Sequence, residues 1–480
     1  MDKPTVRAPH ALALGLFVLV WLSCSWFGSW ELNPNNATRL FAAISLAEQH
    51  DATIDEFQMR TIDKAKFGDH YYADKAPGMS LMAVPAVWIA DAVTGQRAGG
   101  GMVQPNEVQI GNYLRLRLRL AVAMTAAVLT AFAAVLLLDL AVGITGNVQA
   151  GFAAALAYAL GSPAWGWSTT LFGHAPVAAL LLVATWAVWR GTSGPLEFGR
   201  WRYPVMAGAA LGWAVVIEFP AALPGLVIGV WALWRTRDLA LPARARIVGL
   251  AVLAGIAALV PLALYNQLAF GTPLKLGYQG VVGFEGMEQG LFGLTYPKIE
   301  VLAQIVAGPD RGLVWVAPIL VLAPIGLRRL IRTPETRDLG WLATGLVTLV
   351  LLYNASYFYW DGGHSTGPRH SVPALGFLAL GIAPLWASWG ITGRRWISGL
   401  LALSMFINLA IAAAEITAPH GYHFPVVAPV MTRFFSGIIR DLPGEYWGWP
   451  PLAGLALYLA VALPLLGWLL RRATNPSGVP

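Results

Sequence analysis

Long apolar segments recur along the whole chain and determine its predicted architecture. About twelve windows are roughly 20 residues long, which lets a helix cross about 30 Å of hydrocarbon. The first, ALALGLFVLVWLSCSWFGSW at residues 11–30, has full length and lacks a small-residue cleavage site. We therefore interpret it as a retained transmembrane helix and not as a signal peptide. The pattern predicts an all-α polytopic membrane protein.

The polar loops between these windows are of two kinds. Short, arginine-rich loops occupy residues 190–202, 235–246, 328–338 and 393–395, and a similar tail starts at 471. The loops that alternate with them are longer, aromatic and mixed in charge, at residues 266–312, 357–370 and 417–450. Lys and Arg concentrate in cytoplasmic loops of membrane proteins. We therefore expect the first kind inside the cell and the second kind outside.

This orientation fixes the place of the segment that follows the first window. Counted back from residue 190, the windows at 174–189, 148–160 and 118–138 alternate in direction, and the N-terminus with its Lys and Arg is expected inside. Residues 31–117 then form one outer region, in which the short apolar run at 78–93 lies in the interface. The prediction is about twelve crossings in a single domain, 1–480, with both termini cytoplasmic. A full crossing by that run would give about thirteen.

Composition supports this architecture and narrows the classes of function. The chain is 57% hydrophobic and 12% charged, with a mean hydropathy of +0.59, whereas a soluble domain is about 25% charged. Cytoplasmic loops account for the net charge of +7, so no nucleic-acid partner is implied. The single Cys24 excludes an internal disulfide and a cysteine-based metal site. No phosphate-binding glycine motif precedes a helix, which leaves cytoplasmic nucleotide chemistry unsupported.

Ionisable residues gather in the predicted outer loops, first of all in residues 31–117. This loop has about fifty residues before its apolar run, whereas loops that only join helices are usually short. Its segment YYADKAPG places Tyr72 and Lys75 beside an acidic residue. A carboxylate, a lysine and tyrosines together supply a general base, a cation for phosphate, and hydroxyl or stacking contacts. Any one of these charges alone is explained more simply as a solvated loop residue.

A second outer cluster is DGGHSTGPRH, at residues 361–370. Paired glycines allow the backbone to approach a ligand closely. The guanidinium of Arg369 offers a fork that matches phosphate oxygens, and His364 lies between the glycines and this arginine. Aromatic residues just before the cluster are typical of the membrane interface, but these polar residues are not. We therefore expect the cluster to bind substrate.

Other ionisable residues give weaker signals. His174 lies where a window meets the outer surface, and Glu218 lies at an outer helix end. Ionisable groups at membrane depth are candidates for function, so both are predicted to bind substrate. The alternatives are a structural histidine and a glutamate that only reaches toward water. His420 and His423 have metal-ligand spacing, but no third ligand is evident, so no metal is predicted.

In their order along the chain, these segments resemble the GT-C class of membrane glycosyltransferases, such as protein O-mannosyltransferases and lipid A aminoarabinose transferases. The first window and the long acidic loop carry the likeness, followed by YYADKAPG, STTLFGHAP, FGTPLKLGY, RGLVWVAP and WDGGHSTGPRH. The likeness covers most of the chain. It implies a GT-C-like fold and a transferase that moves a sugar from a polyprenyl-phosphate carrier to a glycan, lipid or protein acceptor. It places the active site at the outer, periplasmic face of the cell (inner) membrane, in contact with the bilayer, and implies no cofactor.

Two other classes of function remain open. One is a secondary transporter or flippase of lipid-linked glycans, and the other is a polymerase that acts on such glycans. Transporters tend to show inverted repeats and broken helices with ionisable residues near the midplane. Here no internal repeat is evident and the charge collects in outer loops, which favours the transferase.

The resemblance also implies roles for individual residues. A sugar leaves its carrier as a phosphate monoester, so Lys75 and Arg369 are expected to converge on that phosphate and absorb its charge. The class usually has an acidic pair directly after the first helix, but WELNPNNATRL offers only Glu31 there. Asp55 and Asp63, eight positions apart, are the nearest replacements and would share a face if helical turns joined them. We place Asp63 ahead as the base, because lysines follow it and keep it ionised. Glu31 is the alternative.

The predicted topology has a direct test. A cysteine placed at position 97 or 106 should react with a membrane-impermeant thiol reagent added from outside, because residues 31–117 are predicted to be exposed there. Labelling that occurs only after the membrane is permeabilised would instead support about thirteen crossings.

Overall fold

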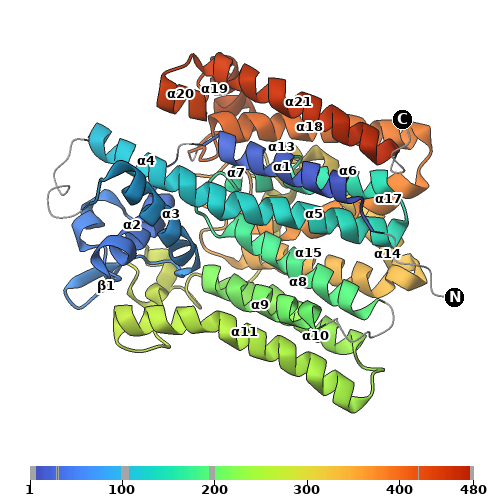
Figure 1. The fold of residues 1–480 in the computed structure, drawn as a ribbon, viewed down its shortest axis with the longest axis horizontal. Coiled ribbons are helices and arrows are strands. Elements are labelled where there is room, and N and C mark those ends of the chain that lie inside the picture. Colours follow the sequence, from blue (N-terminus) through green and yellow to red (C-terminus); the bar gives the residue numbers. More distant parts are fainter. Residues whose placement is uncertain are drawn as a thin grey trace.

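The computed structural model describes residues 7–28, 30, 32–98, 107–193, 201–419 and 421–475. Within these ranges the chain is all-α apart from one antiparallel hairpin, in which β1 (Ala65–Phe67) pairs with β2 (His70–Tyr72). Its long helices run side by side in a bundle (Figure 1). They are α1 (His10–Trp26), α5 (Ala126–Thr145), α8 (His174–Thr192), α9 (Arg202–Ile217), α10 (Ala222–Arg235), α11 (Leu241–Phe270), α15 (Arg337–Ser356), α18 (Ile391–Ala414) and α21 (Pro451–Thr474).

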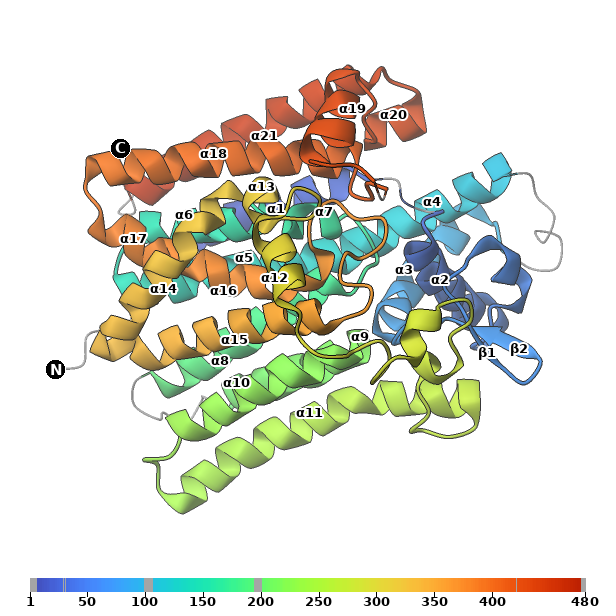
Figure 2. The ribbon, with the colours of Figure 1, turned by 180° about the vertical axis from the view of Figure 1, so that it is seen from behind.

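Shorter helices fill the bundle between the long ones. They are α6 (Val148–Ala159), α7 (Ala164–Trp167), α13 (Leu313–Val316), α14 (Ala323–Arg332), α16 (Leu375–Leu380) and α17 (Ile382–Ser388). Helix α12 (Ile299–Ala307) precedes α13, and α19 (Thr432–Phe435) and α20 (Leu442–Trp447) precede α21. Helix α1 begins and α21 ends at the same end of the bundle (Figures 1 and 2). An even number of crossings requires this arrangement.

Seven helices in the described part of the chain are long and apolar enough to cross a membrane. Shorter apolar stretches occupy four more predicted crossings, at His10–Trp26, Val148–Ala159, Arg202–Ile217 and Phe219–Arg235. The predicted all-α architecture with several apolar helices is confirmed. The count of about twelve crossings remains a prediction.

The elements of the first predicted outer loop gather at the end of the bundle opposite to its termini (Figure 1). They are α2 (Pro34–Ile44), the hairpin, α3 (Gly78–Thr94) and the start of α4 (Glu107–Met124). Helices α4 and α5 follow each other so closely that Gln109–Thr145 is 37 residues long. At 1.5 Å per residue that is about 55 Å, well beyond the roughly 30 Å of hydrocarbon. The first turns of α4 therefore extend past the bundle.

In the predicted orientation, three arginines on this extension lie outside, against a simple positive-inside pattern, and the structure shows their partners. Arg117 is fully buried, and its Nε donates to Asp91 on α3 at 3.1 Å. The guanidinium of Arg119 lies 2.7 Å from the Glu445 carboxylate on α20. Arg115 also has polar partners. Because acidic groups pair with Arg117 and Arg119, an outer position for these two charges would carry little electrostatic penalty.

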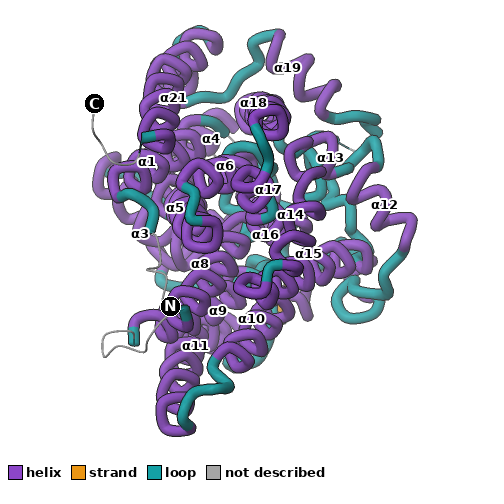
Figure 3. Tube along the Cα trace, turned by 90° about the vertical axis from the view of Figure 1, so that its right-hand side faces the viewer, coloured by secondary structure: helices purple, strands orange, loops and turns teal. Residues whose placement is uncertain are grey.

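Helix α11 lies at the edge of the bundle, packed along α9 (Figure 3). The contact is close because small residues face each other across it. A Cβ atom at Gly208 would lie 1.9 Å from the Ala251 carbonyl oxygen, and one at Gly212 would lie 2.4 Å from that of Gly255. Small residues at such spacing let helix backbones approach within a membrane. Helix α9 is thereby held in place, and its C-terminal end reaches the site.

Candidate functional site

A polar cavity lies where the first-loop elements meet the end of the bundle. Its volume is about 720 Å³ when its open mouth is included. Segments far apart in the sequence line it: Asn35, Arg39, Asp63, Asp74, Lys75, His174, Glu218, Tyr278, Val281, Phe284, Met287, Tyr357, Tyr359, Gly362, Gly363, Arg369 and His370. Three of these side chains are cations and three are carboxylates. The cavity therefore gathers charges of both signs from distant parts of the chain.

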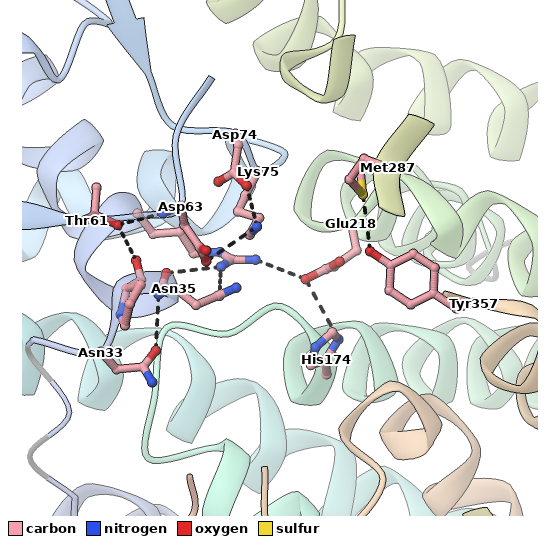
Figure 4. Close-up of polar contacts among 12 residues, drawn as sticks. Asn33, Asn35, Thr61, Asp63, Asp74, Lys75, His174, Glu218, Met287 and Tyr357 are labelled. Atoms are coloured by element: carbon pink, nitrogen blue, oxygen red, sulfur yellow. Dashed lines mark hydrogen bonds and ion pairs between the residues drawn. The ribbon is translucent and has the colours of Figure 1, made fainter. Parts of the chain in front are cut away.

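Lys75 lies between two carboxylates (Figure 4). Its Nζ is 2.5 Å from Oδ2 of Asp74 and 3.4 Å from Oδ2 of Asp63. Burial lowers the pKa of Lys75, but Asp63 and Asp74 together outweigh this effect and raise it above the ordinary value. Burial also raises the pKa of the Asp74 carboxyl, and the nearby Lys75 offsets this only in part. Lys75 is therefore a fixed cation at neutral pH.

Asp63 is tied to α2 through its backbone. Its N–H donates to Oγ1 of Thr61 at 3.1 Å, and that hydroxyl donates to the Pro34 carbonyl at 3.1 Å. The preceding residues form a short 3-10 helix, Asp55–Arg60, which ends at an extended Thr61. The two helical turns that would have placed Asp55 and Asp63 on one face are therefore absent from this described segment.

A second group of charges surrounds Glu218, at the end of α9 (Figure 4). Arg39 is 2% exposed, and one of its terminal nitrogens donates to Oε1 of Glu218 at 3.1 Å. Another donates to the backbone and side chain of Asn35. Nδ1 of His174 lies 3.9 Å from the same Glu218 oxygen. Glu218 thus joins α2, α8 and α9 at the floor of the cavity.

Glycine at position 78 brings the two groups of charges together. A Cβ atom there would lie 2.6 Å from the Val216 carbonyl oxygen and 2.7 Å from the Ile217 nitrogen. The start of α3 therefore rests directly on the backbone of α9, one residue before Glu218. Since Lys75 is three residues before Gly78, this contact holds the segment that carries the lysine close to Glu218.

Arg369 lines the cavity from the segment before α16. Its guanidinium lies over the ring of Phe172, 5.0 Å from the centroid. Gly362 packs against the same side chain, because a Cβ atom at that glycine would be 2.8 Å from Nε of Arg369. The φ angle of Gly362 is +75°, which L side chains rarely adopt. The first glycine of the pair in DGGHSTGPRH is therefore required both for close approach and for its backbone conformation.

A buried arginine anchors the loop that carries this glycine. Arg311 is 4% exposed, and its guanidinium donates to the carbonyls of Asp361 and Gly363 at 3.1 and 3.0 Å. A third nitrogen donates to the carbonyl of Asp310 at 3.0 Å. The carbonyls on both sides of Gly362 are thus fixed, which holds the glycine against Arg369.

A glycine-rich strap, residues 277–293, crosses over the cavity. Near one end, Val281 bridges to β1 at Ala65, and at the other the carbonyl of Gly293 accepts from the Phe358 N–H at 2.8 Å. The strap contributes Tyr278, Val281, Phe284 and Met287 to the lining. It therefore links β1, in the first-loop elements, to the segment that follows α15.

A second, more apolar cavity adjoins the first. Its volume is about 650 Å³, and it shares His174, Glu218, Tyr278, Tyr357 and His370 with the polar cavity. The rest of its lining is largely apolar and comes from α8, the start of α10, α15 and the segment before α16: Val177, Pro220, Ala221, Leu223, Pro224, Leu349, Val350, Tyr353 and Pro373. Leu223 is 42% exposed on the outside of the bundle. The polar cavity and the apolar cavity thus adjoin each other.

The structure brings five of the eight predicted site residues together. Lys75, Arg369, Asp63, His174 and Glu218 all line the polar cavity.

The other three predicted site residues lie elsewhere. Asp55 accepts from the His70 ring and from the Tyr71 N–H, each at 2.6 Å. Tyr72 packs against Phe270, and His364 is exposed, with a polar partner of its own. Glu31 lies outside the described residues.

Several lining residues were not predicted. Arg39, Asp74 and His370 each lie next to or near a predicted residue, or inside a segment that was singled out. Asp74 could have been predicted because it adjoins Lys75, and His370 because it adjoins Arg369. Tyr278 ends the motif FGTPLKLGY, which the sequence analysis singled out. Phe284 and Met287, further along the strap, gave no such signal, because only the fold brings them to the cavity. The described residues contain no group of three or more His, Cys, Asp or Glu side chains able to hold a metal ion.

Comparison with known proteins identifies the fold. No family model matches the chain, and no curated protein does. The crystal structure of ArnT from Cupriavidus metallidurans bound to undecaprenyl phosphate matches with a TM-score of 0.53 at 17% identity, over 96% of this chain and 75% of that one. Apo ArnT matches with a TM-score of 0.52 at 15% identity, over 97% and 76%. The fold is that of the GT-C class of membrane glycosyltransferases.

A third solved structure is less similar. The archaeal oligosaccharyltransferase AglB from Archaeoglobus fulgidus, in complex with an inhibitory peptide and a dolichol-phosphate, has a TM-score of 0.44 at 12% identity. The match covers 90% of this chain and 60% of that one. The resemblance to the GT-C fold that the sequence motifs suggested is thus confirmed by the ArnT structures.

Arg311 holds the loop at residues 361–363, so its replacement should reduce stability and loosen this loop. Arg311→Met removes charged hydrogen bonds to buried carbonyls and should lower the free energy of unfolding by roughly 2–3 kcal/mol. Hydrogen exchange should rise at residues 361–363. Arg237→Met, at an exposed arginine, is the matched control and should change neither quantity. Unaltered exchange at 361–363 in Arg311→Met would show that this arginine does not hold the loop.

Proposed function

We propose that the protein is a glycosyltransferase that moves a sugar from a polyprenyl-phosphate carrier to a glycan, lipid or protein acceptor. The reaction takes place at the outer face of the cell (inner) membrane, which is the periplasmic face in a cell with two membranes. One observation carries the proposal: Lys75 and Arg369, nearly 300 positions apart in the sequence, line a single polar cavity, and an apolar cavity adjoins it. A lipid phosphate needs both features.

The chemistry of the two cavities supports this carrier. Apolar side chains from α8, α10 and α15 suit an isoprenoid tail, because burial of such a tail is favourable in proportion to its area. The cations suit the phosphate that follows the tail. ArnT, which has the same fold, was crystallised with undecaprenyl phosphate, and this supports the same class of carrier here.

The proposed reaction is a displacement at the anomeric carbon of the sugar. A nucleophilic group of the acceptor, such as a hydroxyl, forms a bond to that carbon and gives its proton to a carboxylate. The bond between the carbon and the phosphate oxygen breaks, and its electron pair stays with the phosphate. Lys75 and Arg369 stabilise the negative charge that develops there, which lowers the barrier. The carrier leaves as a phosphate monoester.

Asp63 is the proposed base. It lines the cavity, and its carboxylate is 3.4 Å from the Lys75 ammonium, which favours the ionised form that accepts a proton. Glu218 is held by Arg39 at 3.1 Å and is proposed to orient the sugar or the acceptor. Asp55 is not part of this proposal, because it caps the hairpin and does not line the cavity.

The donor site can be tested without knowledge of the sugar. Lys75→Ala and Arg369→Ala should each weaken binding of undecaprenyl phosphate by about 10- to 100-fold, the expected loss for a charged hydrogen bond. Lys66→Ala is a matched control, since Lys66 is an exposed lysine on β1. Binding can be measured by titration of the purified protein in nanodiscs. Wild-type affinity in both cavity variants would refute the proposed donor site.

The choice of base has a separate test. Asp63→Asn should retain undecaprenyl phosphate binding and reduce sugar transfer by about 10²- to 10⁴-fold, because the amide cannot take the acceptor's proton. Asp55→Asn should stay near wild type. Transfer is measured in proteoliposomes with a panel of polyprenyl-phosphate sugars. If Glu31→Gln or Glu218→Gln abolishes transfer while Asp63→Asn does not, another carboxylate is the base.

A further inference from the structure

His370 occupies the junction of the two cavities and has no role in the reaction described above. Its ring is among the residues that line both cavities. The ring packs edge-on against His174 and Tyr357, with centroids 5.0 and 5.2 Å away. A ligand with its apolar tail in one cavity and its polar head in the other would lie next to this imidazole.

Two cations, Arg369 and Lys75, line the polar cavity together with His370. A neutral imidazole can accept a hydrogen bond at one ring nitrogen, whereas an imidazolium cannot. One ring nitrogen donates to the backbone carbonyl of Tyr359. Because a neutral imidazole has a single N–H, the other nitrogen, Nε2, carries a lone pair and can only accept.

That lone pair has no partner among the described residues. Nε2 of His370 is buried and makes no hydrogen bond in the structure. Nε of the adjacent Arg369 is likewise buried without a partner. Buried polar atoms are nearly always paired in a working protein. Two consecutive residues that line the polar cavity thus carry one unsatisfied acceptor and one unsatisfied donor.

We infer that Nε2 of His370 accepts a hydrogen bond from a hydroxyl of the sugar while Arg369 binds the adjoining phosphate. The inference rests on the proposed function and narrows its substrate to sugars with a free hydroxyl beside the carrier phosphate. The phosphate itself is a poor partner for Nε2, because its oxygens are acceptors as well. Tyr357 is engaged elsewhere, since its hydroxyl lies 3.5 Å from the Met287 sulfur. His370 is therefore a specificity-determining residue.

The test compares a carrier with and without its sugar. Wild type and variants in nanodiscs are titrated with undecaprenyl phosphate and with undecaprenyl phosphates that carry mannose, glucose or aminoarabinose. His370→Phe should weaken binding of the tightest sugar-bearing lipid by about three- to tenfold and leave binding of undecaprenyl phosphate unchanged. His370→Gln, which keeps an acceptor, should recover part of the loss. His423→Phe, at an exposed histidine, is the control without effect.

The other outcomes separate this inference from the proposed function. An equal loss for both lipids, or no loss for either, would overturn the hydroxyl contact. So would a wild-type protein that binds no sugar-bearing lipid more tightly than the bare phosphate. If instead the imidazolium bound phosphate, wild-type affinity for undecaprenyl phosphate would rise at low pH and this rise would vanish in His370→Phe. A wild type that does not bind undecaprenyl phosphate at all would refute the proposed function itself.

Discussion

The ion pairs of Lys75 with Asp63 and Asp74 are the interaction on which the rest of the site depends. A buried ammonium is costly unless carboxylates lie beside it. The position of Lys75 in the cavity therefore depends on both carboxylates. Their separations of 2.5 and 3.4 Å satisfy that condition. The same charges then serve the chemistry we propose: the lysine faces a phosphate, and Asp63 is available to take a proton.

The backbone has to approach closely for these charges to meet. Gly78 rests on the end of α9, and Gly362 rests on Arg369. A third glycine, Gly277, lets the strap pass over Asp74, because a Cβ atom there would lie 3.3 Å from the Asp74 carbonyl oxygen. Larger side chains at these positions would push the walls of the cavity apart. The long first loop is therefore a folded part of the site and not only a connection between helices.

Hydropathy predicted the all-α fold, because apolar length is a local property of the sequence, and the order of the motifs carried the resemblance to the GT-C class. The same reasoning selected Lys75, Arg369 and Asp63, which lie beside other polar residues in outer segments. The sequence did not predict the features of the site that depend on tertiary contacts. Asp55 and Asp63 do not share a helical face, since the chain leaves its 3-10 helix at Thr61. Arg39 and the strap reach the cavity only through packing, which spacing along the chain does not encode.

A cryo-electron microscopy map of the protein with bound undecaprenyl phosphate tests the central claim most directly. We expect the phosphate within hydrogen-bond distance of both the Lys75 ammonium and the Arg369 guanidinium, with the isoprenoid tail in the apolar cavity between α10 and α15. A phosphate bound away from these two cations, or a tail that leaves through another face of the bundle, would contradict it.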